Sequence, residues 1–229
     1  MTGGADRLKL VIFDVDGTLV DSQADILESM ATAFSAIGRE APSRGAVLEI
    51  VGLSLPQAMG RLVPDATETE HARLVETYKD RYAELRRTGT PGNSPLYPGM
   101  SGLVQALNAS DSVLLGIATG KSRRGLDALL GSLDLGRFFV TTQVADDHPS
   151  KPHPSMVLAA LAEAGVEPGD AVMVGDTSFD IEMAQAAGVR AIGVAWGYHD
   201  ATRLTGADRV VSDALALGGA ITDMLEIAP

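Results

Sequence analysis

The chain has 229 residues, of which 45% are hydrophobic, as expected for a globular protein with a sizeable core. Its 18 basic and 30 acidic residues give a net charge of −12, which argues against nucleic acid or an anionic membrane as the main partner. There is no cysteine, so disulfides, thiolate metal sites and thiol nucleophiles are excluded. No apolar stretch resembles a signal peptide or a membrane span, and we therefore expect a cytoplasmic protein. The composition makes no prediction of the oligomeric state.

The first strong pattern is an apolar run followed at once by acidic residues. Leu8 to Phe13 predicts a buried parallel strand, and the segment DVDGTLVDS, Asp14 to Ser22, follows it. Residues two apart in an extended segment point the same way, so the carboxylates of Asp14 and Asp16 are expected to share one volume beyond the strand end. Such a pair needs a cation, and carboxylate oxygens suit Mg²⁺. One carboxylate can also act as a nucleophile that forms an aspartyl-phosphate, whereas the plainer alternative is a polar turn with a helix cap.

Helical patterns, rather than a second strand, come next in the chain. Apolar residues at 3.6-residue spacing predict helices over residues 21–38, 54–63 and from 67 onward. Three pairs resemble capping boxes at their starts: Ser22 with Asp25, Ser54 with Gln57, and Thr67 with Glu70. The segment 90–99 contains three prolines and is typical of a linker. We therefore expect residues 20–95 to form a helical cap inserted into a core made of residues 1–19 and 96–229.

From residue 99 onward, strand and helix patterns alternate. Strands are predicted over residues 112–119, 138–142, 171–175, 190–196 and 209–212. Helices are predicted over residues 101–108, 122–130, 154–164, 179–187 and from 213. Alternation of this kind predicts an α/β fold with a doubly wound, Rossmann-like parallel sheet.

Polar residues stand at several of the predicted strand ends and helix starts. Thr119 and Gly120 end the second strand, Lys151 precedes a helix that begins with proline, and Asp176 and Asp180 follow the fourth strand. Taken singly, the hydroxyl and carboxylate groups can be helix caps and the lysine can be solvated. If these ends meet the first acidic pair, they supply a nucleophile, a metal site and a clamp for phosphoryl oxygens, as phosphoryl transfer requires.

Four of these segments resemble the motifs of the haloacid dehalogenase-like hydrolase superfamily, in its phosphoglycolate phosphatase-like branch. DVDGTLVDS resembles the first motif, IATGKS the second, SKP the third and GDTSFDIEMAQAAG the fourth. The resemblance spans the whole chain, including the helical insertion after the first motif. It departs from the family pattern at Gly120, where an asparagine often follows the threonine.

The resemblance implies a Mg²⁺-dependent phosphatase that acts on a small-molecule phosphomonoester, with phosphoglycolate as the first guess. Asp14 would attack phosphorus and become the aspartyl-phosphate. Asp16 would protonate the leaving oxygen and then take a proton from the attacking water. Mg²⁺ would be held by Asp14, by Asp176 and by the backbone carbonyl of Asp16.

The remaining motif residues would bind and support the phosphoryl group. The resemblance assigns Thr119, Gly120 and Lys151 to the phosphoryl oxygens, and it places Asp180 in a supporting role beside Lys151 or a metal-bound water. In the cap, Arg44 or the segment 52–61, which ends at Arg61, is a candidate contact for a substrate carboxylate. The segments 19–21 and 90–99 are expected to act as hinges for cap movement.

Three alternative functions share parts of this pattern. A phosphomutase of the β-phosphoglucomutase type would use the same scaffold and return the phosphoryl group to a sugar, although the loop 196–200 looks more like the phosphatase branch. A phosphoaspartate receiver domain has similar acidic, threonine and lysine residues but is about half as long and does not turn over. A P-loop NTPase is suggested by residues 116–122, but the glycines there are one position too close for the Walker pattern.

Overall fold

The computed structural model describes residues 7–88 and 94–227, and its centre is a six-stranded parallel sheet. The strands are β1 (Lys9–Phe13), β2 (Val113–Thr119), β3 (Thr141–Val144), β4 (Ala171–Gly175), β5 (Arg190–Val194) and β6 (Arg209–Val211). Their order in the sheet is β3-β2-β1-β4-β5-β6, with every neighbouring pair parallel. The chain direction across the sheet reverses next to β1, which is the point where sheets of this type bind ligands. The predicted doubly wound α/β fold is confirmed.

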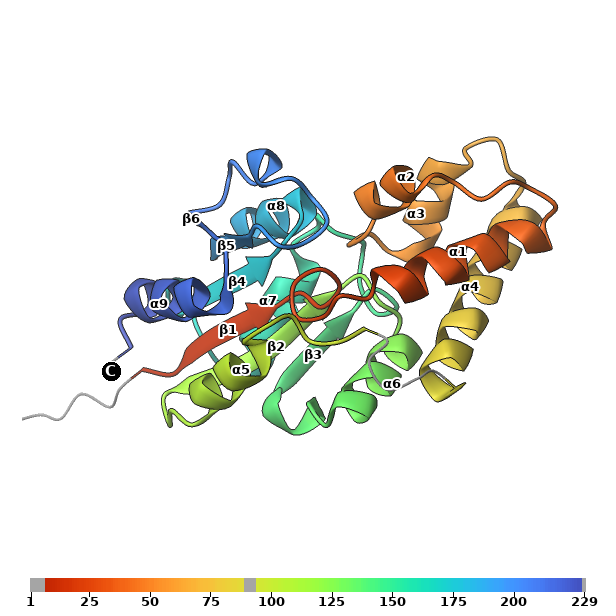
Figure 1. The fold of residues 1–229 in the computed structure, drawn as a ribbon. Helices are drawn as coiled ribbons and strands as arrows, with labels where there is room; N and C mark the ends of the chain where they lie inside the picture. The colour runs from red at the N-terminus through yellow and green to blue at the C-terminus, as the bar shows by residue number, and fades with distance from the viewer. Residues whose placement is uncertain (1–6, 89–93, 228–229) are drawn as a thin grey trace, which may run out of the picture.

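Helices cover both faces of this sheet (Figure 1). They are α5 (Met100–Asn108), α6 (Arg123–Leu133), α7 (Ser155–Ala164), α8 (Ser178–Ala186) and α9 (Ala214–Leu225). Val11 and Phe13 of β1 pack with α5, α6 and α9, whereas Leu10 and Ile12 pack with α7 and α8. The strand therefore has no polar face, which explains its continuous apolar sequence.

Four further helices lie between β1 and α5 in the chain, beyond the carboxyl ends of the strands (Figure 1). They are α1 (Gln23–Ala36), α2 (Arg44–Glu49), α3 (Leu55–Leu62) and α4 (Glu68–Thr88). Their apolar faces form a separate hydrophobic cluster, which includes Met30, Met59 and Leu74 and also contacts Phe179 of α8. The division into a core and a cap stays a prediction, and residues 89–93 of the expected linker lie outside the described residues.

Two element predictions near these helices need correction. The segment at Arg44, where no helix is predicted from the sequence, forms α2, because the Ser43 hydroxyl accepts a hydrogen bond from the Ala46 amide and starts the helix. The third strand covers residues 141–144 instead of 138–142, because residues 136–138 form a short 3₁₀-helix. Among the described helices, none is long and apolar enough to cross a membrane.

The expected capping boxes have different outcomes. Thr67 and Glu70 exchange the predicted hydrogen bonds at the start of α4. Ser54 precedes α3 but makes no side-chain cap there. The Ser22 hydroxyl does not cap α1 and instead donates to the carboxylate of Asp16, so this prediction is wrong. A serine beside an acidic site gains a stronger, charged acceptor than a backbone amide offers.

A buried ion pair ties the start of α1 to the end of α4. Asp25 Oδ2 accepts hydrogen bonds from Arg86 Nη2 and, at 2.8 Å, from the Ser94 hydroxyl. The side chains of Asp25 and Arg86 are only 2% and 5% exposed. Ser94 stands just before α5. The pair and Ser94 therefore join the place where the chain enters helices α1 to α4 with the place where it leaves them.

Asp25→Asn is predicted to lower the free energy of unfolding by about 3 kcal/mol, because it removes the negative charge from a buried, hydrogen-bonded ion pair. The matched control is Glu28→Gln in the same helix, since the Arg81–Glu28 pair is much more exposed and its loss should change the free energy of unfolding little. Urea denaturation of both variants measures the difference. Equal losses in the two variants would contradict this account of the pair.

Candidate active site

The site forms where the carboxyl ends of neighbouring strands meet. Phe13 at the end of β1 pairs with residues of both β2 and β4, so the residues that follow these strands emerge at one edge. Asp14 follows β1, Thr119 ends β2 and Asp176 follows β4. The structure thus brings together three of the residues that the sequence singles out.

Asp14, Asp176 and Asp180 form a buried acidic cluster around one lysine. One carboxylate oxygen from each of the three residues lies within 4.8 Å of those of the other two. The fully buried Lys151 places its Nζ 2.6 Å from Asp14 Oδ1 and 2.6 Å from Asp180 Oδ1. Burial raises the pKa of Asp14 to about 7, although the Lys151 ammonium opposes this. Burial, together with the charges of Asp14 and Asp180, also raises the pKa of Asp176.

Asp180 combines a structural role with its contact to the lysine. Its Oδ2 accepts from the Thr177 amide at 3.0 Å and from the Thr177 hydroxyl at 2.7 Å, which forms a capping box at the start of α8. Its Oδ1 is the atom that accepts from Lys151. Both oxygens of Asp180 therefore have donors, and the residue lies where the sequence places it, beside Lys151.

Asp176 is held in place by donors from two loops. Its Oδ1 accepts from the Thr18 hydroxyl at 2.9 Å, and its Oδ2 accepts from the Tyr198 amide at 2.7 Å. Gly17 packs directly on this carboxylate with φ of +86°, and a Cβ there would overlap the Asp176 oxygens. The glycine of the DVDG segment is thus required twice, by its backbone conformation and by this close approach.

The chemistry of the cluster fits a divalent cation. Asp14 Oδ2 is buried and has no hydrogen-bond partner among the described residues. A buried carboxylate oxygen without a donor is costly, and the neighbouring carboxylates increase the cost. Oxygens of Asp14 and Asp176 are the hard ligands that Mg²⁺ prefers. The Asp16 carboxylate lies outside this cluster, so any contribution of Asp16 to a metal would come from its backbone carbonyl.

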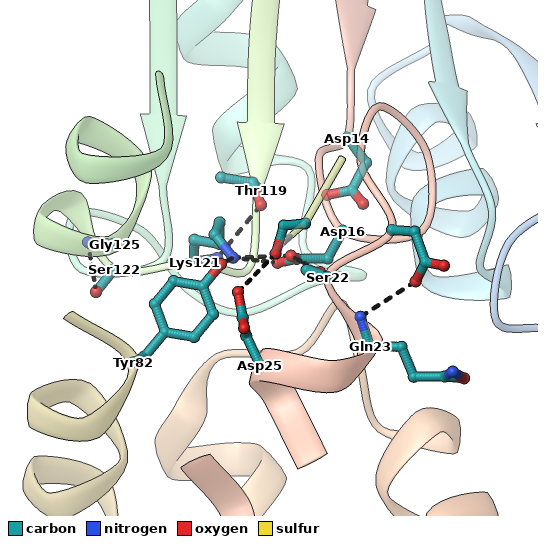
Figure 2. A network of polar contacts seen from close by, with 12 residues as sticks. Asp14, Asp16, Ser22, Gln23, Asp25, Tyr82, Thr119, Lys121, Ser122 and Gly125 are labelled. Carbon is teal, nitrogen blue, oxygen red and sulfur yellow. Dashed lines mark hydrogen bonds and ion pairs between the residues drawn. The ribbon is translucent and has the colours of Figure 1, made fainter. Parts of the chain in front are cut away.

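The Asp16 carboxylate belongs to a second polar network, which sequence reasoning missed. Lys121 Nζ donates to both Asp16 oxygens, at 2.8 and 2.9 Å, and to the Tyr82 hydroxyl at 2.8 Å (Figure 2). The Ser22 hydroxyl also donates to Asp16. Burial by itself lowers the pKa of Lys121, but Asp16 and Tyr82 outweigh burial and raise it, so the ammonium keeps its charge. A lysine before a helix is usually solvated, and only its place in IATGKS points to the site.

The end of β2 shows different roles for adjacent residues. Thr119 is buried, and its hydroxyl accepts from the Lys121 amide at 3.3 Å. Ser122 caps α6 by accepting from the Gly125 amide, which agrees with the plainer alternative for a hydroxyl at this position. A Cβ at Gly120 would lie 2.5 Å from the carbonyl oxygen of Gly52. The close approach of the loop before α3 thus explains why glycine stands where the family often has asparagine.

A cavity of about 60 Å³ lies between the strand ends and helices α1 and α4. The sheet side contributes Asp14, Asp16, Thr119, Gly120 and Lys121, and the helical side contributes Met30, Val51, Leu53, Tyr78 and Tyr82. Arg44 and Arg61, the candidate contacts for a substrate carboxylate, do not line it. Arg44 donates to the Gln23 side chain, and the Arg61 guanidinium lies over the Phe179 ring.

The fold and this site define a doubly wound α/β protein with an acidic centre at its switch point, and comparisons with known proteins agree. The family model of the haloacid dehalogenase-like hydrolases matches residues 11–194. The chain is 36% identical over 212 residues to "Probable phosphatase IndB" of Dickeya dadantii, with 90% of each chain covered. It is 31% identical over 207 residues to phosphoglycolate phosphatase 1 of Pseudomonas aeruginosa, covering 85% of this chain and 72% of that protein.

A solved structure shows the same architecture. The crystal structure of a hydrolase from Pseudomonas syringae matches with a TM-score of 0.83 and 25% identity, covering 96% of this chain and 100% of that chain. The chain belongs to the haloacid dehalogenase-like hydrolase family, and the resemblance stated from the sequence motifs is confirmed.

The raised pKa of Asp14 predicts how the stability of the metal-free protein depends on pH. Because the pKa is about 7 in the folded state against an ordinary value of 3.8, the folded protein holds a proton that the unfolded chain releases between these values. The free energy of unfolding in EDTA should therefore fall as pH rises through this window. Asp14→Asn should remove this part of the fall, as measured by urea denaturation at several pH values. Identical pH dependence in both proteins would contradict the raised pKa.

Proposed function

We propose that the protein is a Mg²⁺-dependent phosphatase that hydrolyses a small-molecule phosphomonoester through an aspartyl-phosphate on Asp14. The predicted enzyme class, a phosphoric monoester hydrolase, is confirmed by the family match and by the relatives named phosphatases. The observation that best supports the finer proposal is the state of Asp14. One of its oxygens is bound to Lys151, and the other is buried without a donor at the edge of a cavity.

In the proposed first step, Asp14 Oδ2 attacks phosphorus while the bond from phosphorus to the leaving oxygen breaks. Asp16 gives its proton to that oxygen, so the product leaves as an alcohol. In the second step, water attacks the aspartyl-phosphate, Asp16 takes a proton from the water, and the bond to Asp14 breaks to release inorganic phosphate. Lys121 supports the second step by orientation, because its two contacts hold the Asp16 carboxylate in place.

The transferring phosphoryl group needs positive charge and hydrogen-bond donors on its oxygens. We assign these contacts to the Thr119 hydroxyl, the Gly120 amide and the Lys151 ammonium. Lys151 is held in position by Asp180, whose other oxygen anchors the start of α8. This arrangement fixes the ammonium before substrate arrives, so little reorganisation is needed during transfer.

Mg²⁺ would be held by the carboxylates of Asp14 and Asp176 and by the backbone carbonyl of Asp16. When bound, the ion neutralises negative charge on the phosphoryl oxygens and on the crowded carboxylates. Asp176 is already oriented by Thr18 and by the Tyr198 amide, and these contacts leave its carboxylate facing the cluster.

We also propose that residues 20–95 act as a cap over a catalytic core of residues 1–19 and 96–229, in a cytoplasmic enzyme. The cavity between the two parts supports this division, because its walls come from both. The relatives named phosphoglycolate phosphatases make phosphoglycolate the first compound to test. Membership in a hydrolase family argues against a receiver domain or a P-loop NTPase.

The proposed function is tested by measuring inorganic phosphate released from p-nitrophenyl phosphate and from 2-phosphoglycolate. Release should require Mg²⁺, stop on addition of EDTA and return with excess Mg²⁺, because the acidic cluster needs a cation to bind a dianionic group. Heat-inactivated protein is the control for contaminating phosphate. Release that persists after thorough chelation would contradict the metal assignment. Transfer of the phosphoryl group to a sugar without phosphate release would instead indicate a phosphomutase.

A further inference from the structure

The wall of the cavity on the side of helices α1 to α4 is mainly apolar. It is built by buried aliphatic side chains: Ile26, Met30, Val51, Leu53 and Ala58. These residues face the strand ends that carry Asp14 and Asp16, so they surround the space where the leaving group of a phosphomonoester would lie. A charged leaving group would lose its hydration there without gaining a partner of opposite charge from these aliphatic side chains.

The positive charges that line the cavity are already paired. Lys121 is bound to both oxygens of Asp16. Lys79 is the single charged residue that the helical side contributes in the described part of the chain, and its Nζ lies 3.3 Å from Asp146 Oδ1. A carboxylate on the leaving group would therefore have to compete with an existing carboxylate for either lysine. It would also lie close to the negative charges of the catalytic centre.

The Tyr78 hydroxyl is a polar group in this wall without a hydrogen-bond partner among the described residues. Tyr78 lines the cavity and stacks on Tyr82, with ring centroids 6.2 Å apart and an interplanar angle of 14°. The Tyr82 hydroxyl accepts from Lys121, whereas the Tyr78 hydroxyl makes no hydrogen bond with any described residue. Burial raises the pKa of Tyr78 well above its ordinary value, so it stays a neutral phenol that can both donate and accept.

Given the phosphatase function proposed above, we propose that the substrate has a compact, uncharged leaving group, with its carbons against Met30 and Val51 and a hydroxyl-type oxygen at Tyr78. The cavity volume of about 60 Å³ sets the size, since a single water needs roughly 10–15 Å³. Phosphoglycolate, with its carboxylate, is a poor substrate on this proposal, although relatives are named for it.

The first test compares phosphate release from matched compounds by the wild-type enzyme with Mg²⁺. The compounds are 2-phosphoglycolate, its neutral amide isostere phosphoglycolamide, 2-hydroxyethyl phosphate and n-propyl phosphate. We expect kcat/KM for the amide and for 2-hydroxyethyl phosphate to exceed that for phosphoglycolate by at least about tenfold, because an unpaired buried charge costs more than one hydrogen bond.

The outcomes separate this inference from the proposed function. Equal or higher kcat/KM for phosphoglycolate than for its amide would overturn the inference and leave the phosphatase function intact. Absence of phosphate release from all four compounds and from p-nitrophenyl phosphate would overturn both. A preference for the neutral compounds supports both.

Variants at the wall give an independent test with a matched control. Met30→Lys puts an unpaired ammonium into the apolar wall, and Met30→Gln is a polar, neutral control of similar length. We expect Met30→Lys to raise the ratio of kcat/KM for phosphoglycolate to that for n-propyl phosphate by about tenfold or more, while Met30→Gln leaves it within about threefold. An unchanged ratio in folded Met30→Lys would overturn the placement of the leaving group.

If Met30→Lys does not fold, Tyr78→Phe provides the test. It should lower the ratio of kcat/KM for 2-hydroxyethyl phosphate to that for n-propyl phosphate by about threefold or more, because the hydroxyl loses its partner. An unchanged ratio would overturn the placement.

Discussion

Three buried carboxylates lie close together and a single buried ammonium contacts two of them, and the rest of the site is arranged around this imbalance of charge. Lys151 lies 2.6 Å from both Asp14 and Asp180, and Asp176 completes the group from the end of β4. Burying such ions costs several kcal/mol each unless donors surround them. Backbone amides and hydroxyls satisfy Asp176 and Asp180, but one oxygen of Asp14 has no donor among the described residues. This oxygen is the one to which we assign attack on phosphorus.

Helix α4 contacts both the network around Asp16, the proposed acid and base, and the cavity proposed for the leaving group. Tyr82 of α4 contacts the Lys121 ammonium, which holds the proposed acid and base, Asp16. One turn earlier on the same helix, Tyr78 lines the cavity for the leaving group. Movement of α4 would therefore change the surroundings of Asp16 and the shape of the cavity together. With such a link, Asp16 would lie in a closed site only when a suitable leaving group fills the cavity.

Much of the fold and of the acidic centre could be predicted because their signals are local in the sequence. The apolar run before Asp14 and the alternation after residue 99 predict a parallel sheet, and strand ends in such a sheet meet at one edge. The role of Tyr82 could not be predicted, because its contact with Lys121 depends on how α4 packs over a distant strand end. The same reason explains Ser22: its sequence favours a helix cap, but the folded chain offers it the Asp16 carboxylate. At Ser22, therefore, a charged tertiary partner overrides the local preference for a helix cap.

The central claim, covalent catalysis by Asp14, is tested most directly by trapping the intermediate. Asp16→Asn should slow both steps for an alkyl phosphate, but p-nitrophenolate leaves without a proton. With p-nitrophenyl phosphate as substrate, the aspartyl-phosphate should therefore still form and then hydrolyse slowly, because no carboxylate remains to take the proton from water. This variant is mixed with substrate and Mg²⁺, quenched in acid and reduced with borohydride, which converts an acyl phosphate to an alcohol. Peptide mass spectrometry should then find homoserine at position 14 and unmodified aspartate at position 176. Phosphate release with an unmodified Asp14, or homoserine at another position, would contradict the account.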